Sequence, residues 1–469
     1  MGTVILFKKV CPDCEKQFNR FQNMKRHIFS KHGKDLTPRT NKDHGKSVDG
    51  FPVHVYNESN VKKYTKQRTT VIIKFACPSC NGLFNEASEL SHHVNNNHIK
   101  IPPSLEDVPP AENRWLVQGH DVSTKFHDYR QTCILASRTT DFAIETHFNE
   151  LLAMSGILVL QRRDGYKDLP VDVFPPSLLT AARNEILASY RRDTYTFQPH
   201  VRSALQSIIQ KFVDEKITET RARIELLSLC EPVDSPEDPE TTEYECAVIM
   251  AVASLLPYLY DCDMKPLSEA QLISSYIHPF MHGLLSAKKP AKVAHCSNII
   301  PDEFDEAVDR PDYKIDVYAS SGYQFSYTNA YGEVKKHGNV SQTLLVKDFY
   351  RLCIFSKEAI DRYNLRNVLF FQVTGNSVTF FSMHLEFSNL YTVTELARLR
   401  VPTRKCDLLD LMGHIDNLMF VASLYRDHCV ISDDDLTSRR CETISSAYLD
   451  AIKKNLAPRK RPCNLTLDS

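Results

Sequence analysis

Two stretches of this chain place cysteines and histidines at the spacing of a tetrahedral metal site. The first, CPDCEKQFNRFQNMKRHIFSKH, spans residues 11–32, and residues 77–98 repeat its plan. In each, two residues separate the cysteines, twelve separate the second cysteine from the first histidine, and four separate the histidines. A unit this short buries too little apolar surface to fold alone, so a bound ion must supply folding energy. The predicted ligands are Cys11, Cys14, His27 and His32, and then Cys77, Cys80, His93 and His98.

Both stretches resemble C2H2 zinc fingers. Apolar residues occupy the positions where a small ββα unit needs its core, namely Phe18 and Met24 in the first and Phe84 and Leu90 in the second. The resemblance implies a finger 1 at residues 9–34 and a finger 2 at residues 75–100. Each finger would hold one Zn²⁺, with two ions for the chain.

The helix faces of the two fingers differ. Counted back from the first histidine, the base-reading positions of finger 1 are Arg20, Asn23 and Arg26. Arginine prefers guanine and asparagine prefers adenine in the major groove, so finger 1 is predicted to bind nucleic acid, with DNA preferred and protein contact as the alternative. The same positions of finger 2 include Glu86 and Glu89, which phosphates repel. Finger 2 is therefore predicted to bind a protein partner or RNA, or to be structural.

Charge and cysteine usage limit the cellular locations and partners that the chain can have. The first hundred residues carry 17 Lys or Arg against 8 Asp or Glu, whereas the whole chain has a net charge of -1. A basic section at this end suits a polyanionic partner. Ten of the 14 cysteines follow no framework, which favours a reducing compartment. No run of apolar residues is long enough for a membrane span. The basic tail residues Lys453, Lys454, Arg459, Lys460 and Arg461 suit nuclear import or merely a solvated tail, so the location is predicted as nuclear, otherwise cytoplasmic.

Composition divides the rest of the chain. A polar linker is expected at residues 35–74 and a proline-rich linker at 101–112. A helical region is expected at 113–262, with helices at 178–190, 200–229 and 244–259 and no chemistry-bearing cluster. A domain at 263–430 and a tail at 431–469 complete the chain. In that domain two strands are expected around Gly375-Asn376, and a helix is expected from Asp407 to about Tyr425.

The segment 310–336, RPDYKIDVYASSGYQFSYTNAYGEVKK, has the period-2 pattern of a β-hairpin. If Gly322-Tyr323 form a two-residue turn, partner numbers total 645 and Asp312 faces Glu333. Glu333 and Lys335 are two residues apart, so they share a face of the strand. Two carboxylates and an ammonium would then suit a divalent cation that holds a phosphate. The alternative is an exposed hairpin with scattered charges.

A helix that begins at Glu269 precedes the hairpin. Ser268 and Gln271 form a capping-box pattern, and the apolar stripe that follows has the helical period, with Pro279 expected to kink it. Glu269 lies at the top of the buried face. It is either a further site carboxylate or a first-turn residue favoured by the helix dipole.

The expected elements come in this order: a helix with Glu269, a strand with Pro311-Asp312, a strand with Glu333 and Lys335, a helix and a strand. The order resembles that of the PD-(D/E)XK nuclease superfamily. Residues 265–425 also look like a group of fungal proteins with a GE(V/I)K motif followed by a helix that reads RLCIFSKEAID here, at 351–361. The resemblance implies that Asp312, Glu333 and Glu269 bind Mg²⁺ or Mn²⁺, and that the Val334 carbonyl completes the coordination. It implies that Lys335 orients the attacking water or neutralises charge on phosphorus.

The expected fold is therefore an α+β multidomain protein, with two small ββα zinc fingers, a helical middle region and an α-β-β-β-α-β PD-(D/E)XK-like core. Two functions stay open. One is a metal-dependent nuclease brought to nucleic acid by finger 1. The other is a non-catalytic zinc-finger factor, for DNA binding or protein interaction, in which an inactive nuclease-like domain serves as a scaffold.

Overall fold

The computed structural model describes residues 108–444, with gaps at 163–165, 167–168, 191–195, 232–241, 263–266, 289, 298–309, 320–323 and 337–340. It also describes 4–6, 27, 31, 54–56, 75–76, 83–84, 448–449 and 452. The chain forms two compact units. Unit 1 comprises 1–102, 304–309 and 444–453, and unit 2 comprises 103–303, 310–443 and 454–469.

Unit 1 contains two short antiparallel ladders. Strand β1 (Val4–Leu6) pairs with β2 (His54–Tyr56), and β3 (Phe75–Ala76) pairs with β4 (Leu83–Phe84). The β3–β4 ladder flanks residues 77–82, where the finger resemblance expects a hairpin. His27 is helical, as the finger 1 pattern requires. The other predicted zinc ligands, and Arg20, Asn23 and Arg26, lie outside the described residues, so the two zinc fingers stay a prediction.

Unit 2 is built on one large mixed sheet, which gives it a mixed α+β architecture. The strand order is β7-β14-β13-β12-β11-β10-β9-β8. Neighbours are antiparallel except for two parallel pairs, β11 with β12 and β14 with β7. The strands are β7 (Ile157–Leu160), β8 (Ala287–Lys288), β9 (Ala291–Cys296), β10 (Tyr313–Tyr318), β11 (Phe325–Lys335), β12 (Asn367–Thr374), β13 (Ser377–Phe387) and β14 (Leu390–Arg400). A separate ladder joins β5 (Leu116–Val117) to β6 (His120–Asp121).

The centre of the sheet is apolar on both faces. Residues 368–371 of β12, Val-Leu-Phe-Phe, are fully buried, as expected of a strand covered by helices on both sides. β12 and β13 join through the predicted turn at Gly375-Asn376, where Gly375 has a φ of 62°. This positive φ at the first turn residue suits a two-residue hairpin, which confirms the prediction for this pair of strands.

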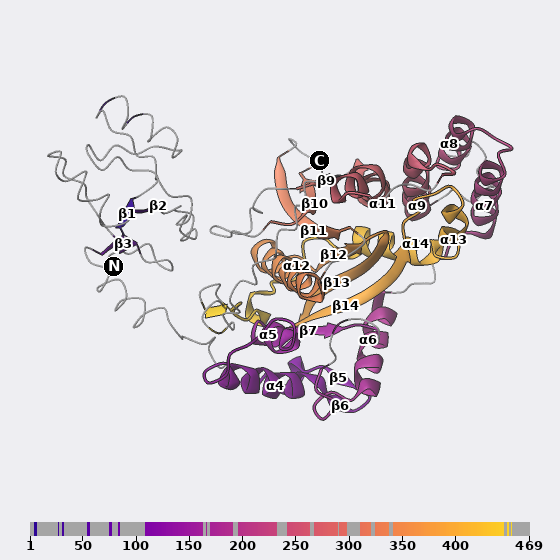
Figure 1. The fold of residues 1–469 in the computed structure, drawn as a ribbon. Helices are drawn as coiled ribbons and strands as arrows, with labels where there is room; N and C mark the ends of the chain where they lie inside the picture. Colours follow the sequence, from indigo (N-terminus) through magenta and orange to yellow (C-terminus); the bar gives the residue numbers. More distant parts are fainter. Residues whose placement is uncertain are drawn as a thin grey trace. The chain divides into compact units, whose positions relative to one another are not determined.

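Helices cover both faces. On one face α12 (Gln342–Tyr363) packs on β11, β12 and β13 (Figure 1). The ring of Phe349 on this helix packs against that of Phe370 on β12. On the other face lie α11 (His278–Leu285), whose His278 Nδ1 is 3.0 Å from the Tyr313 hydroxyl, and α14 (Ile415–His428). The remaining helices are α4 (Val122–Ala136), α5 (Phe148–Met154), α6 (Pro176–Tyr190), α7 (Pro199–Val213), α8 (Glu219–Ser228), α9 (Glu243–Leu255), α10 (Glu269–Leu272) and α13 (Asp407–Met412). Short 3₁₀ turns are η1 (Ala111–Asn113), η3 (Leu256–Tyr258) and η5 (Thr437–Arg439).

The region 113–262 shares its core with the region that follows. Its strand β7 pairs in parallel with β14, and residues 103–303 and 310–443 form one compact unit. The single helix predicted at 200–229 is instead two, α7 and α8, because the chain turns at Glu215, which has a φ of 58°. Likewise the helix predicted from Asp407 to Tyr425 divides into α13 and α14.

A π-helical turn precedes Pro279, the residue at which the sequence predicts a kink. Segment η4 (Ile273–Ile277) is π-helical, lies between α10 and α11, and ends two residues before the proline. Proline has no N–H to donate to the carbonyl of the preceding turn, so the regular hydrogen-bond pattern is broken there. Ser268 caps α10, because its Oγ accepts a hydrogen bond from Gln271 N.

Helix α11 is followed by the two-residue strand β8. Strands β9, β10 and β11, helix α12 and strand β12 then come in that order. Strand β9, which the sequence reading did not foresee, pairs with β10 and extends the sheet by one full strand. Within the part of the chain described, no helix is both long and apolar enough to cross a membrane.

Candidate metal-binding site at the end of β11

The register between β10 and β11 decides which side chains meet. Tyr313 pairs with Gly332 and Ile315 with Ala330, so partner numbers total 645 at this end, as predicted. The predicted turn at Gly322-Tyr323 lies outside the described residues, between the end of β10 at Tyr318 and the start of β11 at Phe325. Tyr318 pairs with Phe325, and two register shifts between that pair and Ile315 restore the expected alignment.

Asp312, Glu333 and Lys335 converge where β11 ends. The Lys335 ammonium lies 3.1 Å from Asp312 Oδ2, 3.3 Å from Glu333 Oε2 and 3.1 Å from the Val334 carbonyl oxygen. Asp312 Oδ2 also accepts a hydrogen bond of 2.9 Å from Val334 N, which fixes the carboxylate against the neighbouring strand. The structure thus brings together three of the four predicted catalytic side chains and the predicted carbonyl.

Helix α12 adds two charged residues that the sequence reading missed. Asp348 Oδ2 is 3.3 Å from Lys335 Nζ, and Asp348 Oδ1 is 3.2 Å from Arg351. The Arg351 guanidinium also lies 3.3 Å from Glu333 Oε1 and donates to the Arg310 carbonyl. One signal was present in the sequence: Asp348 interrupts the apolar stripe of α12, beside the buried Val346 and Phe349. We call Asp312, Glu333, Lys335, Asp348 and Arg351 the Lys335 cluster.

The Lys335 cluster is mostly buried but open at one side. The side chains of Glu333 and Asp348 are 1% and 2% exposed, whereas that of Asp312 is 30% exposed and that of Lys335 14% exposed. Water and small ions therefore reach Asp312 first. Glu333 lies behind it, against the face of the sheet that α12 covers.

Burial and charge shift the pKa values in the Lys335 cluster. Burial, together with the Asp312 carboxylate, raises the pKa of Glu333 to about 9, although Arg351 and Lys335 oppose the shift. Burial also raises the pKa of Asp348. Burial alone would lower the pKa of Lys335, but the charges of Asp312, Glu333 and Asp348 outweigh it and raise that pKa. At neutral pH the structure thus favours a protonated Glu333 beside a charged lysine.

Gly332 precedes Glu333 because no side chain fits at this position. A Cβ built there would lie 2.3 Å from the ring of Phe371, its neighbour in the parallel β11–β12 register. Real Cβ atoms do not approach a ring this closely, so the ring would have to move. The close contact between the two strands sets the position of the Lys335 cluster, which begins one residue later.

Glu269, the fourth predicted catalytic residue, is half-buried in the first turn of α10. Among the described residues, no hydrogen bond or ion pair joins it to Asp312, Glu333 or Lys335. Nor, in that part of the chain, do three or more His, Cys, Asp or Glu side chains form a group that could hold a metal ion. Any ion at the Lys335 cluster would thus rest on two carboxylates and the Val334 carbonyl.

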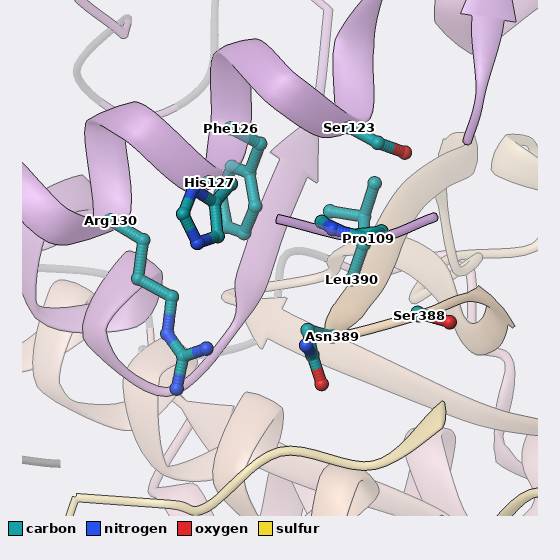
Figure 2. A pocket seen from close by; sticks show the side chains of 8 residues that line it. All are labelled: Pro109, Ser123, Phe126, His127, Arg130, Ser388, Asn389 and Leu390. Carbon is teal, nitrogen blue, oxygen red and sulfur yellow. The ribbon is translucent and has the colours of Figure 1, made fainter. Parts of the chain in front are cut away.

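A small cavity lies elsewhere in unit 2, beside α4. Figure 2 shows His127 and Arg130 of α4 on one side of it and Asn389, from the turn between β13 and β14, on another. The cavity has a volume of about 10 Å³, which is room for about one water molecule. None of its lining residues belongs to the Lys335 cluster, and it is too small for an organic substrate.

Comparison of the chain with models of protein families, with curated proteins and with solved structures finds no match. The chemistry of the Lys335 cluster therefore carries the argument about function.

Proposed function

We propose that unit 2 is a phosphodiesterase of the PD-(D/E)XK type that uses Mg²⁺ or Mn²⁺ and acts on nucleic acid. One observation carries the proposal: the oxygens of Asp312, Glu333 and Val334 all lie within 3.3 Å of one cationic nitrogen, Lys335 Nζ. An arrangement of oxygens that surrounds an ammonium ion can also surround a metal ion. The order of helix, three strands, helix and strand around these residues supports the same assignment.

The donor set fits a hard divalent cation. Asp312, Glu333 and the Val334 carbonyl would hold the ion, and such sites leave the remaining positions to water and substrate phosphate. When bound, the ion would polarise the phosphodiester and lower the pKa of a bound water. Glu333 Oε1 accepts no hydrogen bond, and its only described partner is the Arg351 guanidinium. Together with the raised pKa of Glu333, this indicates a site that gains from further positive charge.

Three side chains, Lys335, Asp348 and Arg351, have the remaining roles. Lys335 orients the attacking water or neutralises charge that develops on phosphorus, since it lies beside both acidic ligands. Asp348 on α12 is a further acidic partner of the Lys335 ammonium. Lys335 therefore keeps a counter-charge when Asp312 and Glu333 bind an ion. Arg351 holds Glu333 in place through its other oxygen.

Finger 1 would deliver this unit to its substrate. Arg20, Asn23 and Arg26 are the predicted contacts to base edges, and the basic charge of the first hundred residues favours a polyanion. In this proposal, finger 2 binds a protein partner or RNA.

A non-catalytic scaffold is the second candidate, and one observation favours it. The Lys335 ammonium fills the space between the carboxylates, so the Lys335 cluster is already a closed network of ion pairs. Such a network can stabilise a fold without chemistry. The protein would then bind DNA or protein through its fingers and cleave nothing.

A cleavage assay separates the two candidates. We expect the full chain to hydrolyse DNA or RNA, single- or double-stranded, in Mg²⁺ or Mn²⁺ and not in EDTA. Glu333→Gln and Lys335→Met should each lower the rate by about 10²-fold or more, because electrostatic stabilisation of the transition state is lost. The matched control is Lys347→Ala, an exposed lysine of α12 outside the Lys335 cluster.

Cleavage that persists in both variants would show that another site does the chemistry. Absence of cleavage in either metal with every substrate, while the protein still binds DNA in a salt-dependent manner, would establish the scaffold instead.

A further inference from the structure

A second polar group lies on the same sheet face as the Lys335 cluster. His295 Nε2 of β9 is 2.8 Å from Asp316 Oδ2 of β10. An ionised carboxylate only accepts hydrogen bonds, so Nε2 carries the proton of this contact. The His295 side chain is 37% exposed, and in the described part of the chain no group bonds its Nδ1. One ring nitrogen is thus fixed and the other is open to solvent.

Asp316 is held rigidly. Its side chain is 5% exposed, its Oδ1 accepts a hydrogen bond of 2.7 Å from Thr328 Oγ1, and Lys314 Nζ lies 3.0 Å from its Oδ2. Burial alone would raise the pKa of Asp316, but the hydrogen bonds from His295 and Thr328 and the charge of Lys314 lower it overall. The carboxylate therefore stays ionised and orients the imidazole ring.

The strand register brings His295 close to the proposed metal ligands. His295 pairs with Lys314. Asp312 lies just before β10, two residues before Lys314, and its carbonyl continues the β9–β10 pairing, so it lies on the same face as Lys314 and His295. Diagonal neighbours of this kind have Cα atoms about 7–8 Å apart. A substrate phosphate held at Asp312 would thus lie one diagonal step along the sheet, about 7–8 Å in backbone terms, from His295.

Ser297 lies in the same row as Asp312. Its backbone N–H donates to the Asp312 carbonyl at 2.9 Å, which continues the β9–β10 pairing by one residue. The Ser297 residue is 8% exposed, and its Oγ has no hydrogen-bond partner among the residues described. A buried hydroxyl without a partner, opposite Asp312 and two residues from His295, indicates that this face takes a polar ligand.

We propose that His295 is a further catalytic residue of unit 2, the general acid that protonates the leaving oxygen of the phosphodiester, with Asp316 as its positioning residue. This rests on the proposed function. As water attacks phosphorus, a bond forms from the water oxygen and the bond to the leaving oxygen breaks. The imidazolium form of His295 carries a second proton on Nδ1; this proton passes to that oxygen, and Nε2 keeps its own proton in the hydrogen bond to Asp316. Solvent takes the proton of the attacking water and returns one to Nδ1.

The dependence on leaving group tests this role. A DNA strand leaves as an alkoxide, which needs a proton, whereas the p-nitrophenyl ester of thymidine 5′-monophosphate leaves as a stable phenolate. We expect His295→Gln to lower the rate on DNA by about 10²–10⁴-fold, the usual contribution of a general acid. The same variant should leave the rate on the p-nitrophenyl ester nearly unchanged. Asp316→Asn should show the same selectivity with a smaller loss.

Two variants serve as references. His120→Ala, an exposed histidine of β6, should behave like the unmodified protein, and Glu333→Gln should lose both substrates equally. An equal loss on both substrates in His295→Gln would show a binding or structural role, and no loss would show no role; either result overturns the proposal about His295 alone. Absence of cleavage of both substrates by the unmodified protein would overturn the proposed function, and the role of His295 with it.

Discussion

At the scale of single residues, the Lys335 cluster is a problem of charge balance. Three carboxyl groups face two basic side chains, and the excess negative charge falls on the most buried member, Glu333. Protonation of Glu333 makes the charges equal, which is the physical meaning of its raised pKa. A divalent cation would restore the ionised form, so metal binding should release a proton.

Stability should depend on pH through this residue. The pKa of Glu333 is raised from its ordinary value of 4.5 to about 9, so between these values the folded protein holds a proton that the unfolded chain has released. The stability of unit 2 should therefore fall as pH rises through this window. Glu333→Gln should lose less stability over the same range. Urea unfolding at about pH 5.5 and about pH 8.5 measures both slopes.

Trp115, the single tryptophan of the chain, makes the experiment specific. It lies in unit 2 and is 2% exposed, so its fluorescence reports the unfolding of that unit. Equal slopes for the unmodified protein and Glu333→Gln would contradict the raised pKa. Glu112→Gln, an exposed carboxyl in the same unit, is the control for loss of a glutamate.

At the scale of elements, the contact of β11 with β12 sets the geometry of the Lys335 cluster. Gly332 lets the Phe371 ring lie against its backbone, and the next residue in β11 is Glu333. The strands would have to separate or the ring would have to turn if position 332 carried a side chain.

Gly332→Ala should therefore destabilise unit 2. The added methyl group meets the Phe371 ring at 2.3 Å, and overpacking of this kind typically costs about 1–3 kcal/mol. The double variant with Phe371→Leu should recover part of the loss, because the two changes share one space. Urea unfolding followed by Trp115 fluorescence measures both. Strict additivity of the two losses would show that the contact is not the cause.

The sequence could predict the hairpin register because alternation and spacing are local properties. The β12–β13 turn was also predictable, since Gly375-Asn376 stands between two apolar runs. The two register shifts between Ile315 and Tyr318 were not predictable, because nothing in the local alternation marks them. Strand β7 has four apolar residues, which a buried helix would also show, and nothing local marks the turn at Glu215.

The site was predictable in part for the same reason. Asp312, Glu333 and Lys335 belong to one hairpin, so their convergence follows from its register. Asp348 and Arg351 reach the Lys335 cluster from a helix, and only the packing of α12 on the sheet reveals their partners. His295 lies on a strand with mixed polarity that the periodicity did not identify.

At the scale of the whole molecule, the chain combines a unit 1 that contains both predicted fingers with a unit 2 that has a large core of its own. We expect purified protein to contain two Zn²⁺ per chain, since each finger supplies a full tetrahedral ligand set. Cys77→Ser should reduce this to one, because three ligands hold zinc weakly, whereas Cys406→Ser, an exposed cysteine of unit 2, should leave two. Mass spectrometry of the metal content measures the ratio.

A chelator that strips zinc should leave the Trp115 fluorescence unchanged, since that residue lies in unit 2. Loss of the signal on chelation would mean that unit 2 also depends on zinc. A metal content of two in Cys77→Ser would show that finger 2 does not bind through this cysteine.

The parallel pairing of β7 with β14 has a consequence for how the protein is made. Residues 157–160 meet residues 391–394 only after more than two hundred further residues have left the ribosome. Until β14 is made, β7 has no partner strand, and the helices near β7 have no sheet edge to pack against. Their apolar surfaces need protection from aggregation during that time. Shortened versions that stop before β14 should thus be insoluble.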